Sequence, residues 1–545
     1  MTRRIPAAPR PTPRRLGALA AGAVALALAL AGCSGGSGSA TNGGGAAGGK
    51  PVAGGNLTFA ISSDLGCIDP QQIGNNDDIN IARQTVASLT SQDPKTGAIE
   101  PWLASSWKTN ADASSFTFTL RTGATYSDGT PVDAASVKDN FEGIQALGAK
   151  AALGSTYLSG LTDVKVIDPQ TVEIDFSGPS AQFLQASSTF SLGLVSPAST
   201  KLSVADRCAG KFAGSGPFTV KSYTPQSQAV LAKRTGYDWG PGTNAHTGEA
   251  YLDSVTFTVV PELSTLTGSL SSGQIDASAD VQVTDLPQFD GNGFWVTNRS
   301  NPGVAYNLIP NEKNPILADK NVRLAISKAI DRSAVAKLLT KWDKPATSVL
   351  SSSTPYWSDQ SALLASDPAA ATKLLDDAGW KPGRGGIREK DGQKLAFTLV
   401  YWQPSNDELQ LVQQELKAIG VDLQLKQTTI ADATAENNGT QALTWLNLTR
   451  ADPDVLRTIF SARGVQQNNH RPVGPVDGVL DQAAATTNKA NRQKLVDEAA
   501  TELIQDGDAI PVYQLSTTIA ASDKVHELKF EASTRIDFYD AWLSK

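Results

Sequence analysis

The sequence predicts an α/β fold in which strands and helices alternate along most of the chain. Short segments with an apolar residue at every second position alternate with longer segments whose apolar residues recur every three or four positions. Between residues 395 and 425 a strand, a helix and a second strand follow one another directly, which predicts a crossover between parallel strands. With 545 residues, 40% of them hydrophobic, the chain is long enough for several domains with separate cores.

The first 32 residues have the composition of a secretion signal. Residues 1–15 hold five arginines and no acid, and residues 16–31 form a short apolar run rich in alanine and leucine. The run ends in Leu-Ala-Gly-Cys at residues 30–33, which resembles the bacterial lipobox and implies cleavage before Cys33 and lipidation of that residue. An arginine pair at residues 14–15 leaves twin-arginine export open beside Sec export.

Residues 33–55 are expected to tether the folded body to the lipid on Cys33. Ten of the 22 residues 34–55 are glycine, which predicts a flexible chain. Loss of the five signal arginines changes the formal net charge from −7 to −12, so a strongly basic nucleic-acid binder is excluded. We expect a monomer at the extracytoplasmic face of the cell membrane, held there by the lipid anchor alone.

The body begins with strand patterns and one capped helix. Residues 56–61 and 115–121 are predicted strands, and residues 164–176 are predicted to form a hairpin. Asp128-Gly129 marks a turn, after which Asp133 is expected to cap a helix. The apolar stripe of that helix is Val137, Phe141 and Ile144, and further strands are expected at residues 217–223 and 251–260.

Residues 367–449 give the clearest element pattern. Asp367 and Pro368 start a helix that runs to Ala378, and Gly379 takes the left-handed position that ends it. A strand at residues 395–401, a helix that begins at the Ser405–Glu408 capping box and a strand at residues 421–425 follow. A fourth strand is expected at residues 443–449.

The ends of these strands supply candidate ligand-binding residues. In sheets of this type ligands bind beyond the carboxyl ends of the strands. This predicts that one rim of a crevice holds Tyr401, Trp402 and Gln403, and that another holds Thr449, Arg450 and Asp452. Trp445 is a further candidate, and the alternative for both tryptophans is an ordinary place in the core.

The composition argues against an enzyme and against a metal site. The chain has three Cys and three His, and His246, His470 and His526 lie far apart in the sequence. No Ser-His-Asp or metal-ligand spacing is visible, and the Gly-x-Ser-x-Gly pattern at residues 32–36 lies in the signal region without flanking strand or helix. We expect no catalytic residue, no metal and no cofactor.

Several stretches resemble one family, the extracellular solute-binding proteins of family 5, which are the peptide-type receptors of ABC importers. The resemblance covers nearly all of residues 56–520 in order. The stretches are Tyr126–Phe141 (YSDGTPVDAASVKDNF), Gly214–Phe218 (GSGPF), Leu263–Ala277, Asn311–Asp319, Val322-Arg323, Ala329–Arg332 (AIDR), Asp367–Gly379 (DPAAATKLLDDAG), Leu416–Gly420 and Asp452–Asp454 (DPD).

The resemblance implies a two-lobed fold of the periplasmic-binding-protein type II kind, with a hinge and an extra inserted domain. By this analogy residues 56–100, 195–300 and 515–545 form lobe I, residues 101–194 form the extra domain, and residues 301–514 form lobe II. The hinge crossings are then expected near residues 304–307 and 510–514. The ligand is enclosed between the lobes by a hinge motion.

The resemblance also directs attention to two loops. Peptide-binding relatives often hold the α-amino group of the peptide with an Asp, and the alignment on Asp452–Asp454 places Thr449 at that position. Either Asp452 or Asp454 takes over that role, or the ligand presents no free amine there, in which case Arg450 suits a carboxylate. The alternative for Arg450 is a salt bridge within its loop.

In lobe I the resemblance places a ligand-facing loop after Asp69-Pro70, at residues 75–78. Asn75, Asn76 and Asp78 are the candidate ligand residues there, and the alternative is a solvated polar turn. Cys67 and Cys208 remain once Cys33 carries lipid, and both fall in the expected lobe I. A disulfide between them is therefore expected, with a pair of free buried thiols as the alternative.

The resulting hypothesis is a binding lipoprotein that captures peptides or peptide-like solutes and delivers them to the permease subunits of an ABC importer. An alternative keeps this receptor role for a metal chelate or siderophore, an opine or an oligosaccharide. A remote alternative is a secreted hydrolase that uses paired acids such as Asp452 and Asp454, although two Asp beside one Pro are more typical of a turn.

Overall fold

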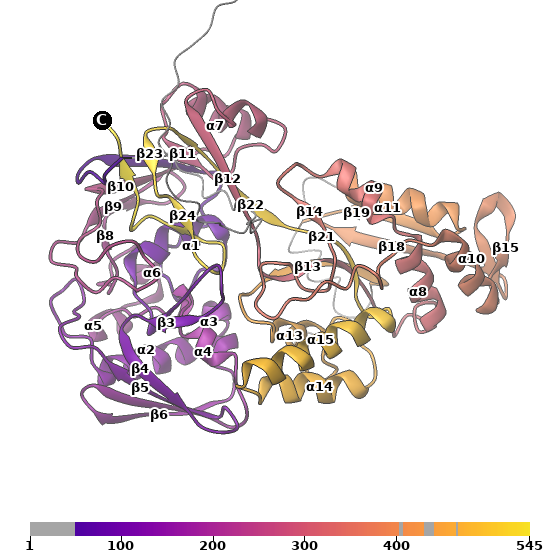
Figure 1. Ribbon diagram of the computed structural model, residues 1–545, viewed down its shortest axis with the longest axis horizontal. Helices are drawn as coiled ribbons and strands as arrows, with labels where there is room; N and C mark the ends of the chain where they lie inside the picture. The colour runs from indigo at the N-terminus through magenta and orange to yellow at the C-terminus, as the bar shows by residue number, and fades with distance from the viewer. Residues whose placement is uncertain (1–48, 403–406, 430–440, 465–466) are drawn as a thin grey trace, which may run out of the picture. The chain divides into compact units, whose positions relative to one another are not determined.

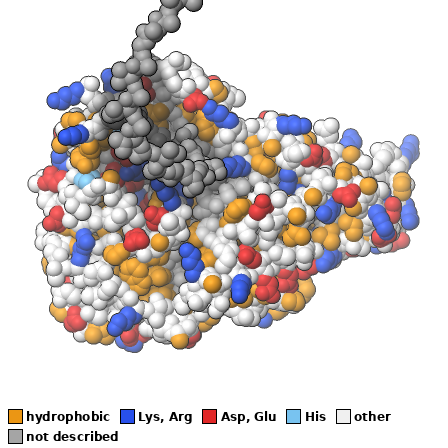
Figure 2. All heavy atoms as spheres, viewed as in Figure 1, with side chains coloured by type: hydrophobic (Ala, Val, Ile, Leu, Met, Phe, Trp, Pro, Cys, Tyr) orange, Lys and Arg blue, Asp and Glu red, His pale blue; other side chains and the backbone are white. Residues whose placement is uncertain are grey.

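The computed structural model describes residues 49–402, 407–429, 441–464 and 467–545 (Figure 1). The expected signal, Cys33, Gln403 and the Ser405 end of the capping box lie outside these residues. Within them no helix is long and apolar enough to cross a membrane. Figure 2 shows acidic and basic side chains interspersed over one face, without a region of a single sign.

A seven-stranded sheet joins the first part of the chain to its last part. Its predicted first strand pairs in parallel with two others, and the remaining pairs are antiparallel. The apolar side chains of the first strand point to both faces, because Phe59 packs edge-on against Phe538 while Ala60 joins the cluster beneath α7 (Leu263–Ser271). The order across the sheet is β12 (Phe294–Ser300), β22 (Ser516–Ser522), β11 (Ala277–Ser278), β1 (Asn56–Ile61), β10 (Ser254–Val259), β9 (Gln228–Lys233) and β8 (Phe218–Thr224).

A four-stranded antiparallel sheet carries the predicted hairpin and the capped helix. The order is β4 (Ala104–Thr109), β5 (Ser115–Leu120), β7 (Thr171–Phe176) and β6 (Leu161–Asp168). In α2 (Ala134–Leu147) the Asp133 carboxylate accepts a hydrogen bond from Ser136 N, as the sequence predicted. The three stripe residues of α2 are fully buried, and Phe141 packs edge-on against Phe183 of α4 (Phe183–Ala186).

A six-stranded sheet forms the third body, and it contains the predicted crossover. β18 (Ala396–Tyr401) and β19 (Asp422–Gln427) pair in parallel and are joined by α11 (Asp407–Ala418). The order is β14 (Lys344–Pro345), β21 (Ile510–Gln514), β13 (Gly303–Pro310), β20 (Leu443–Thr449), β18 and β19. One face packs against α8 (Lys320–Ala329), α9 (Arg332–Leu338), α10 (Pro368–Asp377) and α11, and the other against α13 (Val455–Phe460), α14 (Pro475–Ala484) and α15 (Lys489–Gln505).

The ends of α10 illustrate how local sequence sets a helix. Asp367 Oδ1 accepts from Ala370 N at 2.9 Å, and Pro368 occupies the first turn. Gly379 has φ +86°, the left-handed conformation that the sequence predicted. Trp380 N then donates to Leu375 O at 2.9 Å, and the Trp380 ring is buried in the same core cluster as Leu375. Each predicted feature of this helix is confirmed.

The remaining described elements are short. The helical segments are α1 (Asn76–Ala82), η1 (Arg83–Thr85), η2 (Gly148–Ala151), α3 (Ala152–Tyr157), η3 (Phe190–Leu192), α5 (Pro197–Thr200), α6 (Val204–Cys208), η4 (Leu286–Phe289) and η5 (Arg384–Gly386). The strands are β2 (Thr90–Gln92), β3 (Ile99–Pro101), β15 (Lys381–Pro382), β16 (Arg388–Lys390), β17 (Gln393–Lys394), β23 (Val525–His526), β24 (Lys529–Phe530), β25 (Ile536–Asp537) and β26 (Trp542–Leu543).

Within the described residues the chain passes twice between the seven-stranded and the six-stranded sheet (Figure 1). The first passage lies between β12 and β13, and the second lies at Leu515 between β21 and β22. The two passages are hydrogen-bonded, because Asn301 N donates to Leu515 O at 2.7 Å. The ranges expected for the hinge, residues 304–307 and 510–514, lie inside β13 and β21, next to these passages.

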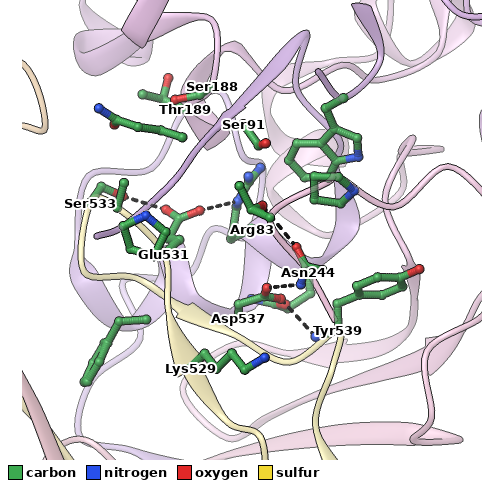
Figure 3. A pocket seen from close by; sticks show the side chains of 18 of the residues that line it. Arg83, Ser91, Ser188, Thr189, Asn244, Lys529, Glu531, Ser533, Asp537 and Tyr539 are labelled. Carbon is green, nitrogen blue, oxygen red and sulfur yellow. Dashed lines mark hydrogen bonds and ion pairs between the residues drawn. The ribbon is translucent and has the colours of Figure 1, made fainter. Parts of the chain in front are cut away.

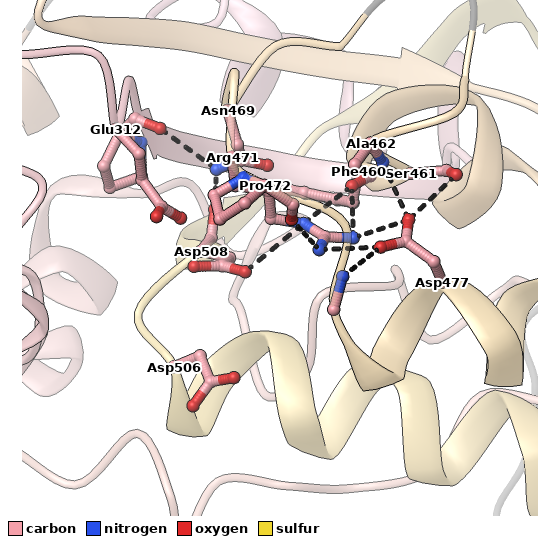
Figure 4. A network of polar contacts seen from close by, with 12 residues as sticks. Glu312, Phe460, Ser461, Ala462, Asn469, Arg471, Pro472, Asp477, Asp506 and Asp508 are labelled. Atoms are coloured by element: carbon pink, nitrogen blue, oxygen red, sulfur yellow. Dashed lines mark hydrogen bonds and ion pairs between the residues drawn. The ribbon is translucent and has the colours of Figure 1, made fainter.

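A buried network of charges ties together the helices of the six-stranded sheet (Figure 4). Arg471 contacts Asp477 at 2.9 Å and Asp508 at 3.5 Å, and Arg323 contacts Asp508 at 3.3 Å and Glu312 at 3.6 Å. Burial, followed by the nearby Glu312, raises the pKa of Asp508 to about 7. Two buried arginines thus share three acids, and burial keeps the pKa of one of these acids, Asp508, above its usual value.

A disulfide joins Cys67 to Cys208 across 141 positions of the sequence. The Cα atoms are 4.1 Å apart, and the neighbouring Ile68 N donates to Cys208 O at 3.1 Å. The bond ties the segment before α1 to the end of α6, so it closes a long loop that contains the whole four-stranded sheet.

Replacing both cysteines, Cys67→Ser with Cys208→Ser, is expected to lower the free energy of unfolding by about 3 to 5 kcal/mol, because the unfolded chain regains the freedom of a long loop. Guanidinium unfolding monitored by tryptophan fluorescence measures the change, and reduced wild-type protein is the matched control. Two free thiols in denatured, unreduced wild-type protein would contradict the bond.

Candidate functional site

The predicted ligand-facing loop after β20 lies where the six-stranded sheet meets the other two. Arg450 N donates to Pro302 O at 3.0 Å, beside the first chain passage. Gln92 Nε2 of β2 donates to Ala451 O at 3.4 Å. The guanidinium of Arg450 lies 5.6 Å from the ring centre of Tyr157, the last residue of α3. The loop therefore contacts both of the other bodies.

Further contacts between these bodies surround a small cavity. Ala181 N donates to Ala484 O at 2.8 Å. Gly97 packs closely against Pro355, because a Cβ atom added at Gly97 would lie only 2.7 Å from Pro355 Cγ. The cavity has a volume of about 120 Å³, which is room for several water molecules. Its lining comes from both sides and includes Gln92, Phe116, Gln185, Tyr356, Asp452 and Arg492.

The two acids offered as amine anchors are already paired with arginines. Asp452 is 5% exposed, and its two oxygens accept from Arg492 at 2.6 and 2.9 Å. Asp454, also 5% exposed, accepts from Arg457 at 2.7 and 2.8 Å. The Asp452 carboxylate thus belongs to a buried ion pair, and a contact of this residue with ligand stays a prediction.

The alternative proposed for Arg450, a salt bridge within its own loop, is wrong. Arg450 Nη1 donates to Thr449 O at 2.9 Å, and among the described residues it forms no ion pair with a carboxylate. No described carboxylate therefore neutralises its charge, and its ligand role stays a prediction. Thr449 is half-buried beside it, at the position where an amine-binding acid was considered.

The aromatic candidates divide between core and surface. Tyr401 and Trp445 are 6% and 5% exposed and pack in the core of the six-stranded sheet, where Trp445 stacks on Tyr306 at 4.9 Å. For Trp445 this core position agrees with the alternative given above, and Tyr401, expected at a crevice rim, lies in the same core. The ligand roles of both residues stay predictions. Trp402 is 42% exposed, and the ligand role of this residue stays a prediction. Gln403 lies outside the described residues.

The acids at residues 77–78 are buried, so the alternative of a solvated turn is wrong for them. Asp77 Oδ2 accepts from Ser63 N at 2.9 Å and Ser63 Oγ at 2.6 Å, while Asp78 Oδ2 accepts from Leu65 N at 3.2 Å. Burial raises the pKa of Asp78 to about 7. Burial and the adjacent Asp77 raise the pKa of Asp280, at the end of β11, to about 7 as well.

The two asparagines beside these acids differ in exposure. Asn76 is exposed at the start of α1, and Asn75 is half-buried, with its Nδ2 3.2 Å from Ser63 Oγ. The carboxyl side of this loop is thus internally hydrogen-bonded, and burial raises the pKa values of both Asp77 and Asp78. The direct ligand roles of Asn75, Asn76 and Asp78 stay predictions.

One side chain near Arg450 was not foreseen. Arg535 follows β24 in the C-terminal segment and is 8% exposed. Its charge is felt by Tyr157, whose pKa is raised by burial against the opposing effect of Arg450 and Arg535. The charges of two arginines that lie 85 positions apart in the sequence thus both act on Tyr157, and no local sequence pattern predicts this.

A second cavity, of about 90 Å³, lies among the segments that pack on the seven-stranded sheet (Figure 3). The charged groups in its wall satisfy one another: Arg83 Nε donates to Glu531 at 2.8 Å, and Asn244 Nδ2 donates to Asp537 at 2.6 Å. Burial, followed by Asp540, raises the pKa of Asp537. Each charged side chain in this wall thus has a hydrogen-bond or ion-pair partner among the described residues.

Comparison with known proteins identifies the family that the chain resembles. A model of the bacterial extracellular solute-binding proteins, family 5 middle, matches residues 98–468. The chain is 25% identical over 339 residues to the nickel-binding periplasmic protein of Escherichia coli K12. This match covers 60% of this chain and 63% of that protein. It is 28% identical over 327 residues to the oligopeptide-binding protein OppA of Mycobacterium tuberculosis H37Rv, covering 57% and 53%. The matches thus span less than two thirds of these relatives.

Solved structures share the fold over a greater length. NikA from Brucella suis in complex with Fe(III)-EDTA superposes with a TM-score of 0.77 at 23% identity, covering 90% of this chain and 100% of that one. AppA from Bacillus subtilis in complex with a nonapeptide gives 0.71 at 20% identity, covering 91% and 100%. The two-lobed architecture is therefore common to this chain and these proteins.

Raised carboxyl pKa values predict that stability falls as the pH rises. The folded state keeps protons on Asp78 and Asp280 that the unfolded chain releases above about pH 4, so the free energy of unfolding decreases between about pH 4 and 7. The limit is about 1.4 kcal/mol per pH unit for each carboxyl. Urea unfolding from pH 4.5 to 8 measures this slope.

Asp280→Asn should flatten the pH dependence, because the amide holds no titrating proton. Asp523→Asn, on an exposed surface position, is the matched control and should leave the slope as in wild type. A slope of opposite sign in the wild type would refute the assignment.

Breaking the buried pair tests whether Asp452 is structural. Arg492→Met is expected to cost about 3 to 5 kcal/mol of stability, because it leaves the buried Asp452 carboxylate without its partner. The double variant Arg492→Met with Asp452→Leu should recover much of that loss. Thermal unfolding measures both, and a single variant as stable as wild type would contradict the structural role.

Proposed function

The chain belongs to the bacterial extracellular solute-binding proteins of family 5, and from this premise we propose that it is the solute receptor of an ABC importer. In this role it captures a solute between two lobes and delivers it to permease subunits in the membrane. The observation that carries the proposal is the loop after β20, which brings the unpaired Arg450 to the place where the three bodies meet. A solute bound there contacts every body at once.

The sheets support the division of the chain into lobes. Every strand of the seven-stranded sheet falls within residues 56–100, 195–300 or 515–545, and every strand of the six-stranded sheet falls within residues 301–514. The four-stranded sheet falls within residues 101–194. We assign these ranges to lobe I, lobe II and the extra domain, with the hinge at the paired passages of Asn301 and Leu515.

The solute proposed first is a peptide or a peptide-like molecule. Relatives named for oligopeptide binding support this class, and AppA holds a nonapeptide in the same fold. The loop after β20 offers no free acid for a peptide amine, since Asp452 and Asp454 are both paired with arginines. Such a peptide is held by groups other than its amine at this loop.

A metal chelate is the second candidate, and the same observation favours it. A chelate with carboxylate arms needs cationic partners rather than an amine anchor, and relatives include a nickel-binding protein and a protein complexed with Fe(III)-EDTA. The described residues contain no group of three or more His, Cys, Asp or Glu that could hold the metal ion itself. The chelate would therefore bring its own ligands. Siderophores, opines and oligosaccharides remain the wider alternatives.

The proposed location is the extracytoplasmic face of the cell membrane. It rests on the secretion signal and the lipobox-like residues 30–33 of the sequence, with lipid on Cys33 as the anchor. No nucleic-acid contact and no catalysis are part of the proposal. The pairing of Asp452 and Asp454 with separate arginines weighs against the hydrolase alternative, because neither carboxylate is free to act as acid or base.

A ligand screen tests the proposal. Protein stripped of ligand by unfolding and refolding is expected to gain thermal stability with peptides of two to eight residues, because a ligand at 100 times its Kd adds about 2.7 kcal/mol to the folded state. Differential scanning fluorimetry measures the shift, and mass spectrometry of natively purified protein identifies the solute it carries. A shift with chelates or sugars alone would replace the peptide by that class, and no shift with any solute would refute the receptor function.

A further inference from the structure

The extra domain contacts lobe II through a backbone hydrogen bond at the end of a helix. Ala181 N, in the segment before α4, donates to the carbonyl oxygen of Ala484, the last residue of α14, at 2.8 Å. The carbonyl groups in the last turn of a helix have no donor within the helix, so they bind another partner or water. Ala181 and Ala484 are 8% and 3% exposed, so here the partner is another body of the protein and water is kept out.

Two glutamines add a second contact with lobe II. Gln185 Nε2 of α4 donates to Gln92 Oε1 of β2 at 3.2 Å, and Gln92 Nε2 donates in turn to Ala451 O of lobe II at 3.4 Å. Both glutamine side chains are buried. Gly97, between β2 and β3, packs against Pro355 of lobe II. The hairpin of β2 and β3 and the extra domain thus form one surface on which lobe II rests.

This surface lies away from the two chain passages. In Figure 1, α14 meets the extra domain in the lower part of the view, whereas β21 and β22, which carry the second passage, lie above the centre. When two bodies rotate apart about an axis at the passages, a point moves in proportion to its distance from that axis. The hydrogen bond of Ala181 with Ala484 is therefore formed in the closed arrangement and lost on opening.

The contact does not depend on the chemistry of the solute. Its donors and acceptors are backbone groups and two side-chain amides that bind one another. None of these groups belongs to a candidate ligand residue. The contact therefore contributes the same free energy to closure whatever solute is enclosed.

One side chain joins this contact to the loop after β20. Arg492 binds the carboxylate of Asp452 in that loop through both terminal nitrogens, and its Nε donates to Ala483 O at 3.2 Å. Ala483 and Ala484 are the last two residues of α14. Arg492 is thus a positioning residue, because it fixes the helix end that the extra domain binds against the loop that bears Arg450.

We propose that the extra domain is a latch that holds lobe II in the closed receptor by binding the end of α14. The inference rests on the solute-receptor function proposed above, and it gives the inserted domain a task separate from solute recognition. Such a latch lengthens the residence of every enclosed solute by the same factor and leaves the choice among solutes to other residues. It also gives the ligand-free protein a population of closed molecules.

Ala181→Pro removes the backbone donor of the latch at a position that accepts proline. Phe183 N donates to Ser180 O at 2.8 Å, so residues 180–183 form a turn whose second position, Ala181, favours proline. Ala181→Ser keeps the amide and is the matched control. Gln92→Leu, which removes the amide that donates to Ala451 O, is an independent second variant.

The closed and open populations are measured by double electron–electron resonance between two spin labels. The labels are carried by Lys150→Cys in the extra domain and Lys489→Cys at the start of α15, both at exposed positions. Cys67 and Cys208 are bonded to each other and take no label. Natively purified protein is compared with protein stripped of solute by unfolding and refolding.

Wild type and Ala181→Ser are expected to show a short-distance population. The ratio of closed to open molecules should fall about threefold to tenfold in Ala181→Pro and about twofold to fivefold in Gln92→Leu, whose contact is longer. An unchanged ratio in Ala181→Pro would overturn the latch, as would a wild type without a short-distance population in both preparations. If Ala181→Pro melts well below wild type, the ratio in Gln92→Leu decides in its place.

Solute binding is measured separately, so the latch and the receptor function can fail independently. Thermal shifts are recorded with peptides of two to eight residues and with Fe(III)-EDTA. A shift together with a closed population that is insensitive to both variants would leave the receptor function in place and overturn the latch. A closed population that depends on Ala181 N, without a shift from any solute, would support the latch and refute the receptor function.

Discussion

The architecture depends on one backbone pairing, the hydrogen bond from Asn301 N to Leu515 O at 2.7 Å. It lies where the chain leaves the seven-stranded sheet and where it returns, and Thr517 Oγ1 reinforces it by donating to Asn301 Oδ1 at 2.8 Å. The ladder of β12 and β22 runs up to this point, with Ser300 opposite Ser516. Two adjacent strands thus carry the connection between large bodies, which permits rotation about a narrow axis without disturbing either core.

Three buried acids near that axis have partners within the protein. Bidentate arginine partners hold Asp452 and Asp454, and hydroxyl and backbone donors hold Asp77. These pairs stiffen the walls on which a solute is enclosed, and they remove negative charge from the space between the lobes. Arg450, which forms no ion pair among the described residues, is a cation at the place where the three bodies meet, although the whole chain carries a formal net charge of −7.

Local sequence patterns predicted the helices and strands well, but they predicted the residues of the candidate site poorly. Caps and periodicity predicted α10 and the parallel pair of β18 and β19, because these depend on neighbours within a few residues. Asp77 and Asp280, which lie 203 positions apart in the sequence, share a buried contact that no periodicity predicts. Tyr401 and Trp445 show the same limit. The strands that contain them, β18 and β20, were predictable, but the face of each strand that packs against a helix layer was not. The predicted roles of Asn75, Asn76 and Trp402 involve solute and cannot be decided by the fold.

The place of β22 has a consequence for how the molecule is made. This strand belongs to the last 30 residues of the chain, yet it lies inside the seven-stranded sheet between β12 and β11. A chain that is still emerging from the ribosome or from an export channel lacks it, so its first sheet stays interrupted although nearly all of its residues are present. The lobe that begins at the N-terminus is thus completed last, and pairing over such sequence distances is slow. Completion of the seven-stranded sheet therefore follows synthesis of β22, and a product that ends before Ser516 lacks the strand between β12 and β11.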